Sequence, residues 1–209
     1  RIDFTGAADI ASGKTFTVFF GNAQADSAGT ASVAAVTMNV AGATTGGGNL
    51  IALAGAGGVA NGNAGDGTIN LNGAVTLGTV TATAGAGGGT TTGADMTLNL
   101  GDAAGDAIAV TSIRVDGGAG AANAGSNATV NVEGVLANAT GGIDVNGGVG
   151  AAAAGGAATI LLDENTTAAF TGNITLDGGG STAAGDGGAG GNGVDAPVST
   201  RQPGGPGLR

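Results

Sequence analysis

Short segments along the chain alternate aliphatic residues with polar ones. One face of these segments carries Met38, Val40, Ile69, Leu71, Leu98, Leu100, Val130, Val132, Ile160 and Leu162. The other face carries Thr37, Asn39, Thr68, Asn70, Thr97, Asn99, Thr129, Asn131 and Thr159. A period of two residues is typical of half-buried β-strands, so we expect strands with an outward ladder of threonine and asparagine. Leu161 interrupts this ladder, because it stands where the other copies have asparagine.

The alternating segments recur at a near-constant interval. Their threonines are separated by 31, 29, 32 and 30 residues. A second marker is the glycine that closes phrases such as IRVDG and ITLDG. From Gly21 to Gly178 it recurs after 34, 30, 32, 30 and 31 residues. Two independent markers with one period of about 30 residues predict a repeat architecture.

The repeat predicts an all-β fold, a parallel β-helix (β-solenoid) of about six coils of about 30 residues each. Glycine is too frequent for helices, and no apolar spacing supports them. Residues 1–195 are expected to form the solenoid, with 1–20 as an irregular N-terminal cap or edge segment. Residues 196–209 hold all three prolines and are expected to be a Pro/Gly-rich tail or linker. The phrase VTATAG, residues 80–85, leaves its register open, because its large residue is shifted by one.

Composition and charge exclude several functions. The chain has no Cys and no His, which removes disulfides, thiolate chemistry and the commonest general base. A net charge of −10 opposes binding to nucleic-acid phosphates and to anionic membranes. Asparagine and glycine interrupt the uncharged stretch between Asp26 and Asp66, so no membrane insertion is expected. Because the chain begins with Arg1 rather than Met, we expect a processed product or a fragment.

Two units of the chain, GGIDVNGGVGAAAAGGAATILLDEN and GNITLDGGGSTAAGDGGAGGNGVD, carry a family resemblance. They resemble the β-helical repeats of secreted bacterial surface proteins of the filamentous-haemagglutinin-like adhesin and autotransporter-passenger type. The resemblance covers most of residues 12–195 and is one of repeat style. It implies a right-handed parallel β-helix that is exported to the cell surface. It transfers no functional residues, because those repeats are scaffolds.

A metal site is the first chemical alternative that the sequence raises. Residues 187–195, GGAGGNGVD, partly match the calcium-binding nonapeptide, but Asn192 stands where the aspartate ligand belongs. A glycine loop is therefore favoured, and calcium is the alternative. Asp102, Asp106, Asp163 and Glu164 fall at predicted turns, where a solvated role is favoured over a surface cation. We expect no cofactor.

Catalysis and glycosylation are the other chemical alternatives. Paired carboxylates suggest glycoside hydrolysis, but the adjacent Asp163 and Glu164 would point to opposite faces of a strand. No Trp or Tyr exists to stack a sugar ring. We therefore expect no enzyme and assign no catalytic residue. The sequons at Asn127, Asn138, Asn165 and Asn173 leave glycosylation open.

The sequence favours a structural role outside the cell. The ends of a solenoid expose strand edges, and no capping helix is predicted at either end. Head-to-tail stacking of copies would cover these edges and build a filament, sheath or adhesin stalk. The expected partner is therefore another copy of the chain, at the cell surface or in the extracellular space. The alternative is a solenoid that binds ice or carbohydrate on its outward ladder of threonine and asparagine.

Overall fold

The computed structural model describes residues 1–22, 31–151, 153–162, 172–181 and 193–195. The regular secondary structure in these residues consists of β-strands. No helix in this part of the chain is long and apolar enough to cross a membrane. The strands in chain order are β1 (Ile2–Phe4), β2 (Ala8–Asp9), β3 (Thr15–Phe19), β4 (Val36–Val40), β5 (Thr44–Thr45), β6 (Asn49–Leu53), β7 (Gly67–Leu71), β8 (Val75–Thr83), β9 (Met96–Leu100), β10 (Ala107–Asp116), β11 (Ala128–Val132), β12 (Val135–Asn138), β13 (Ile143–Asn146), β14 (Ala158–Leu162), β15 (Ile174–Asp177) and β16 (Gly193–Asp195).

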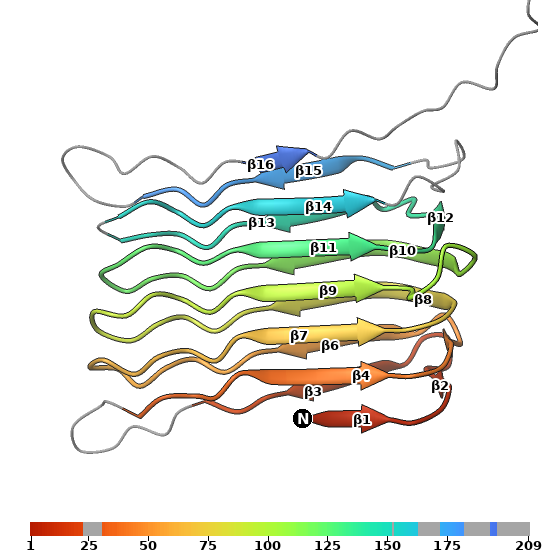
Figure 1. Cartoon of the computed structure of the whole chain (residues 1–209), viewed down its shortest axis with the longest axis horizontal. Coiled ribbons are helices and arrows are strands. Elements are labelled where there is room, and N and C mark those ends of the chain that lie inside the picture. Colours follow the sequence, from red (N-terminus) through yellow and green to blue (C-terminus); the bar gives the residue numbers. More distant parts are fainter. Residues whose placement is uncertain (23–30, 152, 163–171, 182–192, 196–209) are drawn as a thin grey trace, which may run out of the picture.

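The strands form two facing parallel sheets. The front sheet has the order β1-β4-β7-β9-β11-β14-β16, and the rear sheet follows β15-β13-β10-β8-β5-β2, with β3, β6 and β12 paired beside this path. In Figure 1 the front strands run to the right, the chain returns behind them, and each turn lies above the last, which makes a right-handed coil. The parallel β-solenoid predicted from the repeat is therefore confirmed. It has about five turns rather than the expected six, and most of the last repeat lies outside the described residues.

Each turn bends at a corner between its front and rear strands. The long strands β8 and β10 pass through this corner unbroken. The preceding turn splits the same path into β5, paired at Val75, and β6, paired over Val80–Thr83. This pairing settles the register that the sequence left open, because Val80 aligns with Leu50 on one side and Ile113 on the other.

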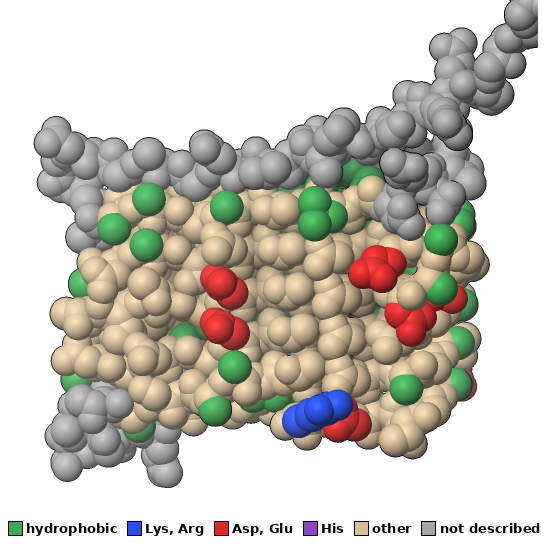
Figure 2. Space-filling model, viewed as in Figure 1, with side chains coloured by type: hydrophobic (Ala, Val, Ile, Leu, Met, Phe, Trp, Pro, Cys, Tyr) green, Lys and Arg blue, Asp and Glu red, His purple; other side chains and the backbone are tan. Residues whose placement is uncertain are grey.

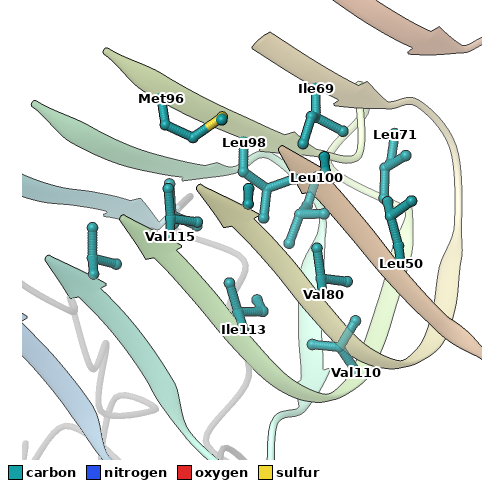
Figure 3. Packing of buried hydrophobic residues seen from close by; sticks show 14 of the residues in the cluster. Leu50, Ile69, Leu71, Val80, Met96, Leu98, Leu100, Val110, Ile113 and Val115 are labelled. Carbon is teal, nitrogen blue, oxygen red and sulfur yellow. The ribbon is translucent and has the colours of Figure 1, made fainter. Parts of the chain in front are cut away.

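The core is a set of aliphatic columns between the sheets. Along the front strands β4, β7, β9 and β11 alternate residues point inward, and the rear strands face them with aliphatic residues of their own. Leu50, Ile69, Val80, Leu98 and Ile113 are almost completely buried there. Figure 3 shows these side chains meeting between the two sheets, with Leu50, Val80 and Ile113 of successive turns beside one another. In the middle turns the space between the two sheets is filled by Val, Leu, Ile, Met and Ala, so each turn packs directly on its neighbour.

The end of each turn opposite the corner is made of glycine and alanine. We call this region, residues 55–66, 85–95, 117–127 and 147–157, the glycine lobe. Backbone hydrogen bonds of 2.8–3.0 Å zigzag through it from one arm of a turn to the other. They run from Ala94 to Gly85, Gly118 to Ala94, Ser126 to Gly118, Gly148 to Ser126, Gly156 to Gly148 and Gly179 to Gly156, with the N–H named first. A side chain at Gly85, Gly118 or Gly148 would overlap the carbonyl of the preceding turn, so only glycine permits this backbone-to-backbone packing.

The N-terminal segment is more regular than the sequence indicated. Residues 1–20 contain β1, β2 and β3, which pair with the second turn in the same register as the later turns. The strands β1 and β2 have three and two residues, which is too short to show a period, so the sequence alone indicates an irregular start. The predicted tail, residues 196–209, lies outside the described residues.

Candidate functional site

The predicted outward ladder is the most regular surface feature of the molecule. The front strands align Thr37, Thr68, Thr97, Thr129 and Thr159 in one column. They align Asn39, Asn70, Asn99 and Asn131 in a second column, which Leu161 continues. The threonines and asparagines are all half-buried against their neighbours in the stack. The structure thus brings together every residue that the sequence assigned to the ladder.

The asparagine column is a continuous chain of side-chain hydrogen bonds. Each Nδ2 donates to the Oδ1 of the preceding turn, over 2.5–2.7 Å from Asn131 to Asn99, from Asn99 to Asn70 and from Asn70 to Asn39. Such ladders form because in-register stacking offers each amide an identical partner one strand away. The asparagines therefore stabilise the stack along its axis.

Asp3 of β1 closes the N-terminal end of this chain. Its Oδ1 accepts the last amide hydrogen from Asn39 at 2.7 Å and a hydrogen bond from the Arg1 guanidinium at 2.8 Å. The hydrogen bond from Arg1, with that from Asn39, lowers the pKa of the Asp3 carboxyl. A carboxylate suits this place because it only accepts hydrogen bonds. Asp3 is not among the residues predicted for the ladder, although its position between Ile2 and Phe4 repeats the alternation of the ladder strands.

The other end of the ladder is unsatisfied. Asn131 lies opposite Leu161 in β14, so its Oδ1 is buried without a hydrogen-bond partner. Leu161 points outward and is 49% exposed. Leu161 therefore destabilises the stack in two ways: one hydrogen bond of the ladder is missing, and an aliphatic side chain is exposed to water.

The face that carries the ladder is broad and has few charges (Figure 2). Acidic side chains gather at two places to the sides of the front strands, and a basic and an acidic side chain lie together at the lower edge. Asp66, Asp95 and Asn127 lie in a column of their own, where each side-chain oxygen accepts the backbone N–H of a residue in the next turn. These polar groups are engaged in holding adjacent turns together.

The acidic turn residues have structural partners. Asp102 Oδ1 accepts the N–H of Gly73, and Asp106 Oδ2 accepts those of Asp102 and Ala103. Among the described residues no three acidic groups lie close enough together to hold a metal ion. Asp163, Glu164 and Asn192, together with the greater part of the proposed calcium loop, lie outside the described residues.

The rear sheet carries a small cluster of charges that the sequence analysis did not single out. Arg114 contacts Asp116 at 2.9 Å and Asp144, one turn further, at 3.8 Å. The hydrogen bond to Asp116 raises the pKa of Arg114. Asp116 also accepts a hydrogen bond from Asn146 at 2.9 Å. Because these groups satisfy one another and lie at the surface, they bind adjacent turns and contribute little more.

The N-terminal end of the core is hollow. A cavity of about 200 Å³ lies there between the sheets, lined mainly by apolar side chains that include Phe4, Ile10, Phe16 and Leu50. Phe4 and Phe16 reach across it from opposite sheets and meet edge to face, with ring centroids 5.9 Å apart. Thr44 also lines the cavity, and its buried Oγ1 has no hydrogen-bond partner. Thr44 aligns with Val75, which follows it in the corner column, so a polar residue stands at an aliphatic position.

We find no match to this chain among protein-family models, curated proteins or solved structures.

Proposed function

We propose that this protein is a structural, non-catalytic component of an extracellular or cell-surface assembly, in which solenoids stack head to tail. The filament, sheath or stalk would be a homopolymer whose subunit interface continues the stacking seen between turns. The observation that carries the proposal is the N-terminal end of the solenoid. There the first strands of both sheets are outermost, and the aliphatic core is open as a cavity.

An open parallel strand edge is a strong template for another strand. Within the described chain β1 and β3 each have a partner on one side only. Their free N–H and C=O groups therefore face outward, and proteins that stay monomeric usually cover or disrupt such edges. An added turn would pair these groups and bury the apolar cavity at the same time.

Electron microscopy and sedimentation across a range of protein concentrations test the proposal. We expect oligomers whose length grows with concentration and whose thickness equals that of one solenoid, because stacking adds subunits along the axis. A sharp monomer peak at the highest concentrations, with no filaments on the grid, would rule out the structural proposal.

The regular ladder supports a second candidate, binding of ice or carbohydrate on the front sheet. Five threonines and four asparagines form two straight columns on a sparsely charged face, with a spacing of about 4.8 Å between strands. Regularly spaced hydroxyl and methyl groups would order water or contact a repeating ligand. The stacking proposal is preferred because the asparagine amides are already bonded to one another.

Thermal hysteresis and glycan-binding measurements test this candidate. If the face binds ice, Thr97→Tyr should abolish thermal hysteresis, since a large ring at the middle rung would break the flat surface. Thr81→Tyr, which places the same ring on the rear sheet, should leave hysteresis unchanged. Absence of both hysteresis and glycan binding in the unmodified protein would remove the candidate.

A further inference from the structure

We propose that the N-terminal cavity and the adjacent edge of β3 form a socket for the C-terminal edge strand β15 of a second copy. This interface rests on the proposed function and defines it: Ile174 of the incoming copy would align with Phe16, Thr175 with Thr17, and Leu176 with Val18. The register follows from the columns of the rear sheet, in which Phe16, Leu50, Val80, Ile113, Ile143 and Ile174 succeed one another.

The hydrogen-bonding groups of the two edges match in this register. In parallel strands, successive residues direct their backbone groups to opposite neighbours. The Lys14 C=O and the Phe20 N–H bond to β6, so the even-numbered residues of β3 direct their backbone groups to β6. The backbone groups of Thr15, Thr17 and Phe19 therefore point to the open edge. The carbonyl groups of Asn173 and Asp177 accept hydrogen bonds from the turn before β15. Ile174 and Leu176 therefore direct their backbone groups to the C-terminal edge, where β15 has no partner among the described residues.

This arrangement repeats the junctions inside the solenoid. Where β13 meets β15, the backbone N–H of Ile143 in β13 donates to the C=O of Asn173, just before β15. The side chain of Ile143 points into the core, and that of Asn173 points outward. The proposed junction would again join inward-pointing residues below, Ile174 and Leu176, to outward-pointing residues above, Thr15 and Thr17. A shift by one residue would lose this match and turn the aliphatic side chains away from the core.

The apolar side chains at the two ends are complementary. Ile174 and Leu176 are only partly buried in the C-terminal turn, and Phe4, Phe16 and Ile10 border the cavity at the other end. Joining the ends would place the partly buried Ile174 and Leu176 against the mouth of the cavity and remove apolar surface of both copies from water.

The front sheet leaves room for the same junction. β16 pairs only with Ala158–Ile160, so the second half of β14, with Leu161 and Leu162, has a free edge among the described residues. The columns of Ile2 and Phe4 end at Ile160 and Leu162, which is where β1 of the second copy would pair. Asp195 occupies the column that Ile2 of the second copy needs, and Val194 occupies the column of the preceding Arg1. Displacement of this end of β16 by the second copy is part of the proposal.

The absence of cysteine from the chain permits a direct test by crosslinking. The double variant Thr17→Cys, Thr175→Cys places one thiol at each end of the same outward column. Within one copy the two positions are separated by five strand spacings, about 24 Å, which no disulfide can bridge. Between stacked copies they would be adjacent. Mild oxidation is therefore expected to give a ladder of linear, disulfide-linked oligomers.

A register control keeps the test specific. In Thr17→Cys, Asp177→Cys, the second thiol lies two residues further along the same exposed strand, about 8 Å from its target when the rise along the strand and the strand spacing are combined. This pair is expected to crosslink at least about tenfold more slowly than the Thr17–Thr175 pair. Equal rates for the two pairs would show that collisions, not the proposed junction, form the disulfides.

Proline at the open edge supplies an independent readout. Thr17→Pro removes an N–H that no strand among the described residues of the same copy uses, so the folded monomer should be retained. Self-association should need about tenfold more protein, whereas Thr17→Ser should assemble as the unmodified protein does. Full assembly of a folded Thr17→Pro variant would overturn the proposal.

The outcomes separate this interface from the proposed function. If the unmodified protein assembles but the Thr17–Thr175 pair does not crosslink faster than its control, the socket is wrong and the structural role stands. If the protein is monomeric at all concentrations, both fail. A monomer that retains a small apolar molecule after purification, detected by mass spectrometry, would also overturn the socket, because another ligand would occupy the cavity.

Discussion

At the scale of single residues, the asparagine ladder shows how one side chain limits the stack. Asn131 Oδ1 is buried and unpaired because Leu161 supplies no donor. We expect Leu161→Asn to extend the ladder by one rung and to raise the free energy of unfolding by about 1 kcal/mol, the usual net value of a hydrogen bond. Urea denaturation followed by circular dichroism would measure the change, since the chain has no Trp or Tyr.

Leu161→Ala is the matched control for this prediction. It removes the same half-exposed side chain without supplying an amide, so it should not stabilise the protein. Equal stabilisation by both variants would show that loss of exposed aliphatic surface, rather than the new hydrogen bond, accounts for the effect.

Asp3 connects the same ladder to pH. Its pKa is lowered below the ordinary value of 3.8, mainly by the hydrogen bond from Arg1. Because the folded-state pKa of Asp3 is lowered, its contribution to stability is fully present above the unfolded-state pKa. It is lost as the pH falls through the folded-state pKa. We expect the unmodified protein to lose more stability than Asp3→Asn between about pH 5 and pH 3, measured by urea denaturation. Parallel pH curves for the two proteins would contradict this role.

The ladder is the part of the candidate site that residue patterns predict well. Its members share one residue type at one interval, and parallel stacking leaves each only one place to lie. Asp3 and Thr44 could not be found in this way, because each differs in type from the column it joins. Their roles depend on which turn comes first in the stack, and the spacing of residues along the sequence does not show this.

At the scale of elements, the glycine lobe sets how closely the turns approach. We expect Gly118→Ala to lower the free energy of unfolding by about 1–3 kcal/mol or more, because its Cβ would overlap the backbone of Gly85 and Ala94 and force the arms apart. Denaturation curves would give the difference directly.

Gly105→Ala provides the comparison. Gly105 lies in a turn of the same coil, and a Cβ there would meet nothing within 4 Å. Its effect should stay within about 0.5 kcal/mol. If both substitutions lowered the free energy of unfolding equally little, the glycine lobe would tolerate side chains, and close packing would not explain its glycines.

The sequence predicts the front strands better than the rear ones. Front strands alternate Thr and Asn with aliphatic residues, so the period is easy to see. In β8 the two residues at the bend, Gly78 and Thr79, both lie outside the core, so the alternation shifts by one residue there. The register of such a strand appears only through its pairing with Leu50 and Ile113. The regular backbone bonding of the glycine lobe has no side-chain period at all, so the sequence pattern does not predict it.

At the scale of the whole molecule, contacts join residues about one repeat apart. The front strands pair Thr68 with Thr97, a separation of 29 residues. We therefore expect removal of residues 68–96, one complete turn, to give a shorter but folded solenoid, because each turn contacts only its neighbours. Far-ultraviolet circular dichroism should show the same β-signal per residue, with a modestly lower free energy of unfolding.

Removal of residues 68–81, about half a turn, is the matching control. It would join a front strand to a rear strand and leave the aliphatic columns broken, so it should abolish cooperative unfolding. A folded half-turn deletion, or an unfolded whole-turn deletion, would contradict the independence of the turns.

The amide chain from Asn131 to Asp3 gives the solenoid a direction as well as support. All of its donors point the same way, towards a carboxylate at one tip, while an aliphatic residue interrupts it at the other. Two copies that met through like tips would oppose carboxylate to carboxylate at one tip or leucine to leucine at the other. A polymer of this chain would thus be vectorial, with two chemically different tips that elongate at unequal rates.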